Sequence, residues 1–394
     1  MDLLINIILG FFAVMLGFNL LYMLFFSIMG HLLPKPPKLP ITKKNKFAIF
    51  MPSYKGDEVI LNTAKEVLKQ DYDSALFDVV VIADSLMPET ILELRKSPII
   101  VVEVKFENST KGKSLNAGIK AVQNNHYDYA VILDIDNVME PSYLTKLNER
   151  LQLGQQVIQT HRAAKNEDTQ FSVLDGISEE VNNHIFRKGH KTVGLSAALI
   201  GSGKALKYPL FVEIMSEITA VGGFDKEMEI LLISRRINID YADDIIVYDE
   251  KVQFAEIFQN QRRRWMSAQL VFMRKYALKG IVKSIITFNI DYLDKCVQLI
   301  LLPRVINLGL TGLMIISYFL NPWFGKFFLF TLIAQIIVLL ISTPKKYFNE
   351  KGLSSMARLP YGFFLMFMNL FKLRGANKKF IHTPHSTSQK ENKN

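Results

Sequence analysis

The apolar run that ends at Leu133 is followed directly by Asp134, Ile135 and Asp136. If this run is a buried strand, the two carboxylates point the same way, because side chains two residues apart share a face. Two carboxylates this close repel each other unless a proton or a cation lies between them. Oxygen ligands of this kind suit Mg²⁺ or Mn²⁺, with a diphosphate completing the coordination shell. The pair therefore predicts a divalent metal site with Asp136 and Asp134 as ligands.

Polar side chains also follow the first two strand-like runs, where Pro52, Tyr54 and Glu58 come after one strand and Asp84 ends the next. Open parallel sheets bind ligands at the carboxyl ends of their strands. Tyr54 could stack on a base, and Glu58 or its neighbour Asp57 could accept hydrogen bonds from a base or ribose. The alternative is an ordinary loop, with Asp84 serving as a helix N-cap.

A basic segment, Lys111-Gly112-Lys113, opens a stretch with helical spacing. Lysines at the start of a helix oppose the helix dipole, so they are poor choices for stability alone. They make sense if an anion binds there beside free backbone N–H groups. The segment is not a Walker A loop, because the required glycine spacing is absent. The alternative is a solvated basic turn.

The elements that must position these residues lie between residues 47 and 275. Short β-rich runs alternate there with helical patterns, which indicates βαβ units and a mainly parallel sheet flanked by helices. A region of this length can bury one α/β core. The expected strands are Phe47–Met51, Val79–Ala83, Ile99–Val104 and Ala130–Leu133, and the expected helices include Val59–Gln70 and Lys113–Gln123.

Apolar runs flank this region. Leu3–Met29 is longer than the roughly 20 residues that span a bilayer, and its acidic start at Asp2 favours a retained anchor over a cleaved signal peptide. We therefore expect an anchor over residues 1–33 and a basic, Pro-rich linker over residues 34–46. The lysines of the linker place that side of the anchor in the cytoplasm.

After the central domain we expect an interfacial amphipathic helix over residues 276–298, best seen in Ile281–Lys295. Two transmembrane helices should follow over residues 299–342, as Leu299–Leu320 and Trp323–Ile341. Residues 343–394 should form an interfacial helix and a basic tail. This topology has three spans, with the α/β domain and the tail on the cytoplasmic side.

The chain has 394 residues, of which 49% are hydrophobic, and a net charge of +10. Such a charge suits nucleic acid, anionic lipid or a phosphorylated substrate. No basic stripe with interleaved aromatics is present, so a nucleic-acid partner is not expected. Cys296 is the single cysteine, which excludes an intrachain disulfide and a cysteine metal site and fits a reducing compartment.

The order of these motifs resembles membrane-bound family 2 glycosyltransferases, the relatives of cellulose, chitin and hyaluronan synthases, which have a GT-A fold. The resemblance covers about Phe47 to Lys275. It rests on the residues after the first strand, Asp84, the Lys113–Asn116 segment, the two aspartates, Gly201-Ser202-Gly203, and a Q-x-x-R-W motif at Gln261, Arg264 and Trp265.

The resemblance implies roles for these positions. Asp84 would bind the base or ribose, with Lys113 and Asn116 also on the nucleotide-sugar side, and Asp134 and Asp136 would hold the diphosphate through the metal. The residues at the membrane-facing mouth, contacting diphosphate and acceptor, would be Gly201, Ser202, Gly203, Gln261, Arg264 and Trp265.

Two further segments each allow a functional role and a plainer alternative. Phe380, His382 and Thr383 could form a gating segment over the nucleotide, or belong to a disordered basic tail. His161 and Arg162 could line the acceptor path, or be ordinary polar residues at a strand end.

The sequence departs from the family at the general base. The family usually supplies it from a Thr-Glu-Asp motif after Gly-Gly-Phe, which is absent after Gly222-Gly223-Phe224. By position, Glu227 falls where the aspartate normally lies, with Asp225 as second candidate and Glu229 as third. A glutamate can serve if it reaches the acceptor hydroxyl.

The expected function is inverting transfer of a sugar from a nucleotide-diphosphate sugar, UDP-sugars foremost, to a glycan or lipid-linked acceptor. The expected place is the cytoplasmic face of a bacterial cell membrane, in the synthesis of a cell-surface or extracellular polysaccharide. The enzyme could be processive, with a homo-oligomer or an export partner completing a channel, or could add one sugar to a lipid carrier. The remaining alternative is a catalytically weak regulatory subunit.

Overall fold

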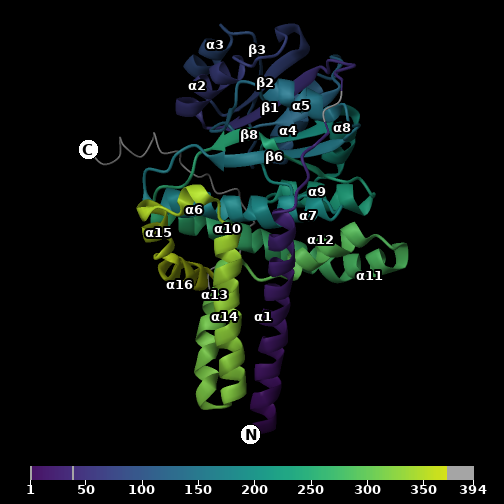
Figure 1. Ribbon diagram of the computed structural model, residues 1–394. Coiled ribbons are helices and arrows are strands. Elements are labelled where there is room, and N and C mark those ends of the chain that lie inside the picture. Colours follow the sequence, from purple (N-terminus) through teal and green to yellow (C-terminus); the bar gives the residue numbers. More distant parts are fainter. Residues whose placement is uncertain (1, 38–39, 371–394) are drawn as a thin grey trace, which may run out of the picture.

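The computed structural model describes residues 2–37 and 40–370 of the chain. An α/β domain lies at one end of the molecule, a layer of helices lies beneath its sheet, and long helices extend away from that layer (Figure 1).

The sheet has eight strands in the order β3-β2-β1-β4-β7-β6-β8-β5. Four of its seven pairings are parallel, which confirms the expected α/β fold with a mainly parallel sheet. The antiparallel pairings all involve β7 or β5. The strands are β1 (Phe47–Tyr54), β2 (Phe77–Asp84), β3 (Ile99–Val104), β4 (Tyr129–Ile132), β5 (Val138–Met139), β6 (Val157–Ala164), β7 (Lys204–Lys207) and β8 (Asp240–Asp249).

Helices cover both faces of the sheet, because the central strands are apolar on both sides. Phe50 of β1 belongs to the core under α4, α8 and α9, whereas its neighbour Ile49 belongs to the core under α2, α3 and α5. This alternation is the period of two that a strand imposes. The helices are α2 (Asp57–Val67), α3 (Pro88–Leu94), α4 (Lys111–Ala121), α5 (Tyr143–Leu151), α8 (Tyr208–Glu217) and α9 (Phe224–Ser234), with a short η1 (Ser74–Leu76).

The layer beneath the sheet contains helices from three separate parts of the chain (Figure 1). One of them, α16, packs on α10 and α13 through Met266, Ile306 and Met366. The layer comprises α6 (Gln170–Asn182), η2 (Asn183–Gly189), α7 (His190–Thr192), α10 (Ala255–Phe272), η3 (Met273–Ala277), α11 (Leu278–Thr287), α12 (Ile290–Ile300), η5 (Lys345–Tyr347), α15 (Glu350–Met356) and α16 (Leu359–Leu370).

Among the described residues, two helices, α1 (Asp2–Gly30) and α14 (Pro322–Ile341), are long and apolar enough to cross a membrane. A third span exists if α12 is counted together with α13 (Arg304–Met314) and η4 (Ile315–Phe319), which meet at a bend of 57°. The expected continuous helix Leu299–Leu320 is therefore corrected. The chain leaves the helix before Pro303, which cannot donate a backbone hydrogen bond, and starts again at Arg304.

The expected single amphipathic helix at Ile281–Lys295 is also corrected, because two helices occupy this stretch. Phe288 takes a left-handed conformation with φ of 50° and ends α11, and Asn289 then caps α12 by accepting a hydrogen bond from Tyr292 N. On α11, apolar side chains such as Leu278 and Ile286 are exposed, as expected of a helix lying on a lipid surface.

Polar and aromatic contacts attach α1 to the layer beneath the sheet. The Tyr22 hydroxyl donates to Asp294 Oδ1 at 2.6 Å and lies 2.8 Å from His190 Nε2. The Phe26 ring stacks on the His190 imidazole with centroids 3.7 Å apart. The anchor is therefore packed against the interface helices as well as joined to the α/β domain through the linker.

Candidate active site

A cavity of about 660 Å³ lies between the carboxyl ends of the strands and the helices beneath the sheet. Its walls come from the ends of β1 and β2, the turn after β4, the segment before β7, the start of α9, and α10. The cavity brings together many of the residues expected from the sequence, namely Pro52, Tyr54, Asp84, Asp134, Asp136, Gly201, Asp225, Gln261, Arg264 and Trp265.

Both aspartates of the D-x-D pair line the cavity, but not as residues of a strand. Because β4 ends at Ile132, Asp134 and Asp136 lie in the turn that follows, closed by a 3.1 Å hydrogen bond from Asn137 N to Asp134 O. Ser202 Oγ accepts a hydrogen bond from Asp134 N at 2.9 Å. Ser202 itself does not line the cavity, so its role is to hold the turn.

Asp136 lies among other acidic groups. Burial raises its pKa well above the usual aspartate range, and the nearby charges of Asp249, Asp134 and Glu250 raise it further. A divalent cation between Asp134 and Asp136 would relieve this repulsion, so the donor set fits Mg²⁺ or Mn²⁺. Within residues 2–37 and 40–370, no cluster of three or more His, Cys, Asp or Glu side chains could hold a metal ion.

Of the two lysines in the basic segment, Lys111 reaches the cavity. Its ammonium group pairs with Asp134 and donates to Gly201 O at 2.7 Å. Lys113, the lysine expected from the sequence, instead donates to Asn108 O at 2.8 Å and does not line the cavity. Two residues advance a helix by about 200°, so the two lysines point to opposite sides.

Three other expected residues have structural positions outside the cavity. Asn116 ties α4 to α8 through a 3.2 Å hydrogen bond to Met215 O. Gly203 has φ of 66°, and a Cβ there would approach Thr160 Oγ1 to 3.1 Å, so the position needs glycine. Glu58 lies in the first turn of α2.

Of the three candidate bases, Asp225 alone lines the cavity. The Glu227 carboxylate turns away and accepts hydrogen bonds from Thr219 N at 2.8 Å, Ala220 N at 2.7 Å and Lys275 Nζ at 2.9 Å. These three donors occupy its oxygens with structural contacts. Among the candidate bases, the cavity therefore contains Asp225 and not Glu227.

The Glu229 carboxylate also makes structural contacts. Its carboxylate is fully buried, accepts a hydrogen bond from Leu199 N at 2.8 Å and lies 2.9 Å from Lys295 Nζ. Glu229 thus joins α9 to α12.

Glutamine at position 227 is expected to lower the free energy of unfolding by about 1–3 kcal/mol at pH 7, because it removes a charged acceptor from three donors. Burial alone would raise the Glu227 pKa, but the bonds from Lys275 and the two backbone N–H groups lower it below 4.5. The stabilisation is therefore complete above about pH 4.5 and is lost as the pH falls through the folded-state pKa. Chemical denaturation of both proteins at pH 7 and pH 4 tests this, and an equal difference at both pH values would contradict it.

On α10, Arg262 fixes the position of neighbouring aromatic side chains. Arg262 pairs with Asp175 and lies between two rings, with its guanidinium 4.7 Å from the Phe258 centroid and 4.5 Å from that of Trp265. This stacking positions the Trp265 indole in the cavity wall. Burial lowers the pKa of Arg264, and the charges of Asp134 and Asp225 oppose that effect.

The two residues at the end of β6 differ in their positions. Arg162 lines the cavity and donates to Glu179 Oε2 at 2.8 Å. His161 does not line the cavity, and its Nδ1 lies 2.9 Å from the Tyr241 hydroxyl and 3.1 Å from Asp243 Oδ1.

Lys204 has no counterpart among the sequence expectations. It follows Gly203, is fully buried, and holds its ammonium 4.3 Å from the Phe224 ring centroid. Within the described part of the chain its Nζ has no hydrogen-bond partner. Burial lowers the pKa of Lys204 to about 7. The negative charge of Asp225 raises this pKa, and the positive charge of Lys111 lowers it further. In the sequence, the only sign of Lys204 is that a charged residue directly follows Gly203.

Methionine at position 204 is expected to stabilise the fold by on the order of a few kcal/mol near neutral pH. The folded state favours the neutral amine, so the cost of burying Lys204 grows as the pH falls from 10.5 to about 7 and is constant below that. Thermal unfolding at pH 6, 8 and 10 should show a gain in melting temperature that shrinks toward pH 10. A lower melting temperature for the variant at pH 6 would contradict this account.

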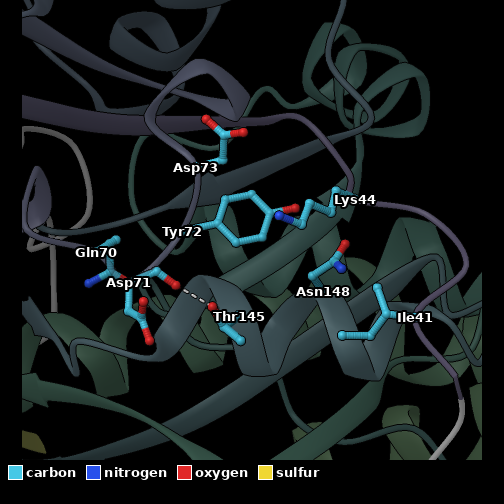
Figure 2. A pocket seen from close by; sticks show the side chains of 8 residues that line it. All are labelled: Ile41, Lys44, Gln70, Asp71, Tyr72, Asp73, Thr145 and Asn148. Atoms are coloured by element: carbon cyan, nitrogen blue, oxygen red, sulfur yellow. Dashed lines mark hydrogen bonds between the residues drawn. The ribbon is translucent and has the colours of Figure 1, made fainter.

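A second hollow, of about 430 Å³, lies beside α5 and contains none of the expected site residues. Figure 2 shows the Tyr72 ring across it from the helix that carries Thr145 and Asn148. Its polar groups serve the packing of this edge, since Thr145 donates to Asp71 O and Gln70 donates to Glu140 O. The proposed gating residues Phe380, His382 and Thr383 lie outside the described residues.

Comparison with known proteins adds to this picture. Residues 44–268 match the model of the family described as "Glycosyltransferase like family 2". No curated protein matches the chain.

Two solved structures match the chain over most of its length. The mannosyltransferase PcManGT from Pyrobaculum calidifontis, in complex with GDP-Man and Mn²⁺, shares 14% identity over 84% of this chain and 99% of its own, with a TM-score of 0.52. S. aureus TarS 1–349 in complex with UDP shares 13% identity over 75% of this chain and 90% of its own, with a TM-score of 0.38. At such identities the first of these shows a common fold and nothing finer.

Proposed function

The chain belongs to the glycosyltransferase-like family 2, and from this premise we propose that it transfers a sugar from a nucleotide-diphosphate sugar to an acceptor at a membrane surface. The observation that carries the proposal is the meeting of four groups in one cavity. These are the D-x-D pair, Asp225, the Q-x-x-R-W side chains and Asp84.

The donor would lie across the carboxyl ends of β1 and β2. Tyr54 and Asp84 would bind the base and ribose, and Lys111 and Arg264 would bind the diphosphate, because cations and buried arginines suit phosphate oxygens. A divalent ion held by Asp134 and Asp136 would act as a Lewis acid on the departing diphosphate. The solved structure of similar fold holds GDP-Man with Mn²⁺, and we propose a UDP-sugar, beside GDP-mannose, as the first donor to test.

The transfer would be a single in-line displacement. Asp225 takes the proton from the acceptor hydroxyl, whose oxygen attacks the anomeric carbon from the face opposite the diphosphate. The bond between that carbon and the diphosphate oxygen breaks, and the configuration inverts. One carboxylate suffices, because the diphosphate leaves as an anion that Lys111 and Arg264 stabilise.

The membrane assignment is supported by α1 and α14, which are long and apolar enough to span a bilayer. Lysines of the linker and Lys345 and Lys346 after α14 support a cytoplasmic position for the α/β domain, which we propose lies at a bacterial cell membrane. There the enzyme would contribute to a cell-surface or extracellular polysaccharide, either as a processive synthase with an oligomeric or export partner or by adding single sugars. A regulatory subunit would not need the paired carboxylates.

The test uses the detergent-purified full chain with a panel of UDP-sugars and GDP-mannose, each with Mn²⁺ or Mg²⁺. Release of nucleoside diphosphate should occur with at least one donor, stop on chelation with EDTA, and return when the metal is restored. Product length then separates single transfer from polymer synthesis. Absence of release with every donor, or release that EDTA does not affect, would overturn the proposal.

A further inference from the structure

The cavity extends from the D-x-D pair down to the break between α12 and α13. Its floor there is apolar and consists of Leu299, Leu301, Leu302 and Pro303. Leu302 N donates to Asn19 Oδ1 at 3.0 Å. Asn19 lies 11 residues before Gly30 at the end of α1, which at 1.5 Å per residue is about 16 Å along the helix. The floor therefore lies beside the apolar part of the anchor helix.

Below this floor the long helices pack directly on one another. Leu9, Ala13 and Leu16 of α1 form a buried cluster with Phe328 of α14, and side chains of α13 pack against it. A Cβ at Gly17 would lie 3.4 Å from the Phe327 ring. In the part of the chain that the structure describes, side chains fill the space between these helices. A long acceptor would therefore leave the cavity sideways, at the level of the helix break.

A positively charged side chain, that of Arg304, lies at this exit. Arg304, the first residue of α13, lines the cavity, and its Nη2 donates to Ser178 O at 2.9 Å and Ser178 Oγ at 3.1 Å. Within residues 2–37 and 40–370, no carboxylate lies within ion-pair distance of its guanidinium. Neighbouring Arg262 already pairs with Asp175. Arginine binds phosphate through parallel N–H donors, so this position suits a phosphate group.

We infer that the acceptor is a sugar linked to a lipid through a phosphate or diphosphate, with the phosphate on Arg304, the hydrocarbon chain in the bilayer beside α13, and a hydroxyl of the linked sugar toward Asp225. This inference rests on the proposed function and selects the substrate class. A growing glycan that crosses the bilayer would need a passage between α1, α13 and α14, which Leu16 and Phe328 occupy.

The test measures binding of tritiated C15 polyprenyl phosphate to the full-length protein in nonionic detergent, by scintillation proximity. Unlabelled C15 polyprenyl phosphate should displace the label. Inorganic phosphate and the uncharged C15 polyprenol should each be at least about tenfold weaker as competitors, because each lacks half of the interaction. Arg304→Gln should weaken binding by about tenfold or more, and Arg304→Lys should recover part of the loss.

Arg274→Gln is the matched control, since Arg274 is an exposed arginine of the same helical layer, and its replacement should leave binding unchanged. If inorganic phosphate competes as well as the lipid, Arg304 belongs to a site for free anions and the inference fails. Equal competition by the polyprenol, or absence of specific binding, overturns it as well. Release of nucleoside diphosphate by the same wild-type preparation shows independently whether the proposed function stands. The competition arms need no variant, so a misfolded Arg304→Gln protein leaves the test intact.

Discussion

Exchange of Asp225 for asparagine is expected to lower the rate of sugar transfer by about 10²–10⁴-fold, the contribution usual for a positioned general base. The amide has nearly the same size as the carboxylate but cannot take the proton from the acceptor. Asp225 lies in the first turn of α9 and lines the cavity. Asp134 and Asp136 line the same cavity. Binding of the donor should persist, so the loss should appear in kcat.

Glu227→Gln is the matched control for this experiment, two residues farther along α9. Its carboxylate is held by Thr219, Ala220 and Lys275, so its loss should affect stability and leave the transfer rate nearly unchanged. Initial rates at saturating donor and nucleotide-sugar binding by calorimetry separate the two effects. An inactive Glu227→Gln protein beside an active Asp225→Asn protein would return the base to Glu227.

Exchange of Asp136 for asparagine is expected to lower the rate of transfer by about 10³-fold or more. A bound metal ion stabilises the charge of the transition state by several kcal/mol, and each loss of about 1.4 kcal/mol lowers the rate tenfold. The amide removes a charge that the cation needs. It also relieves the repulsion by which Asp249 and Asp134, after burial, raise the pKa of Asp136. The variant should therefore lose activity while keeping or gaining thermal stability.

The measurement is a Mn²⁺ titration of donor-dependent nucleoside diphosphate release, with the melting temperature recorded for each protein. Asp71→Asn is the control, since Asp71 lines the second hollow away from the site. An Asp136→Asn protein with an unchanged metal requirement would refute the assignment of the metal to this pair.

Much of the α/β domain could be predicted because its core strands are short apolar runs bounded by polar residues. β1, β2 and β3 agree closely with the predicted runs. The antiparallel insertion of β7 could not be predicted, because pairing of Ala205 with Val131 depends on long-range packing. The division of one expected amphipathic helix into α11 and α12 depends on the left-handed Phe288, a conformation that sequence rarely reveals.

Many of the residues that line the cavity could be predicted from the order of motifs, but the direction of individual side chains could not. Lys111 and Lys113 differ by two residues on one helix, and only the phase of α4 decides which one faces Asp134. Glu227 seemed suited by position, yet its partner Lys275 lies far along the chain. Lys204 was missed because its burial follows from the sheet and not from its neighbours in sequence.

The attachment of α1 to the interface helices has a consequence for acceptor choice. Tyr22 bonds to Asp294 and Phe26 stacks on His190, so under the proposed function these contacts would hold the proposed catalytic carboxylates at a fixed height above the bilayer. An acceptor must then project its hydroxyl to that height. The spacing between the lipid phosphate and the terminal sugar thus becomes a molecular criterion, and acceptors one sugar too short or too long would miss Asp225.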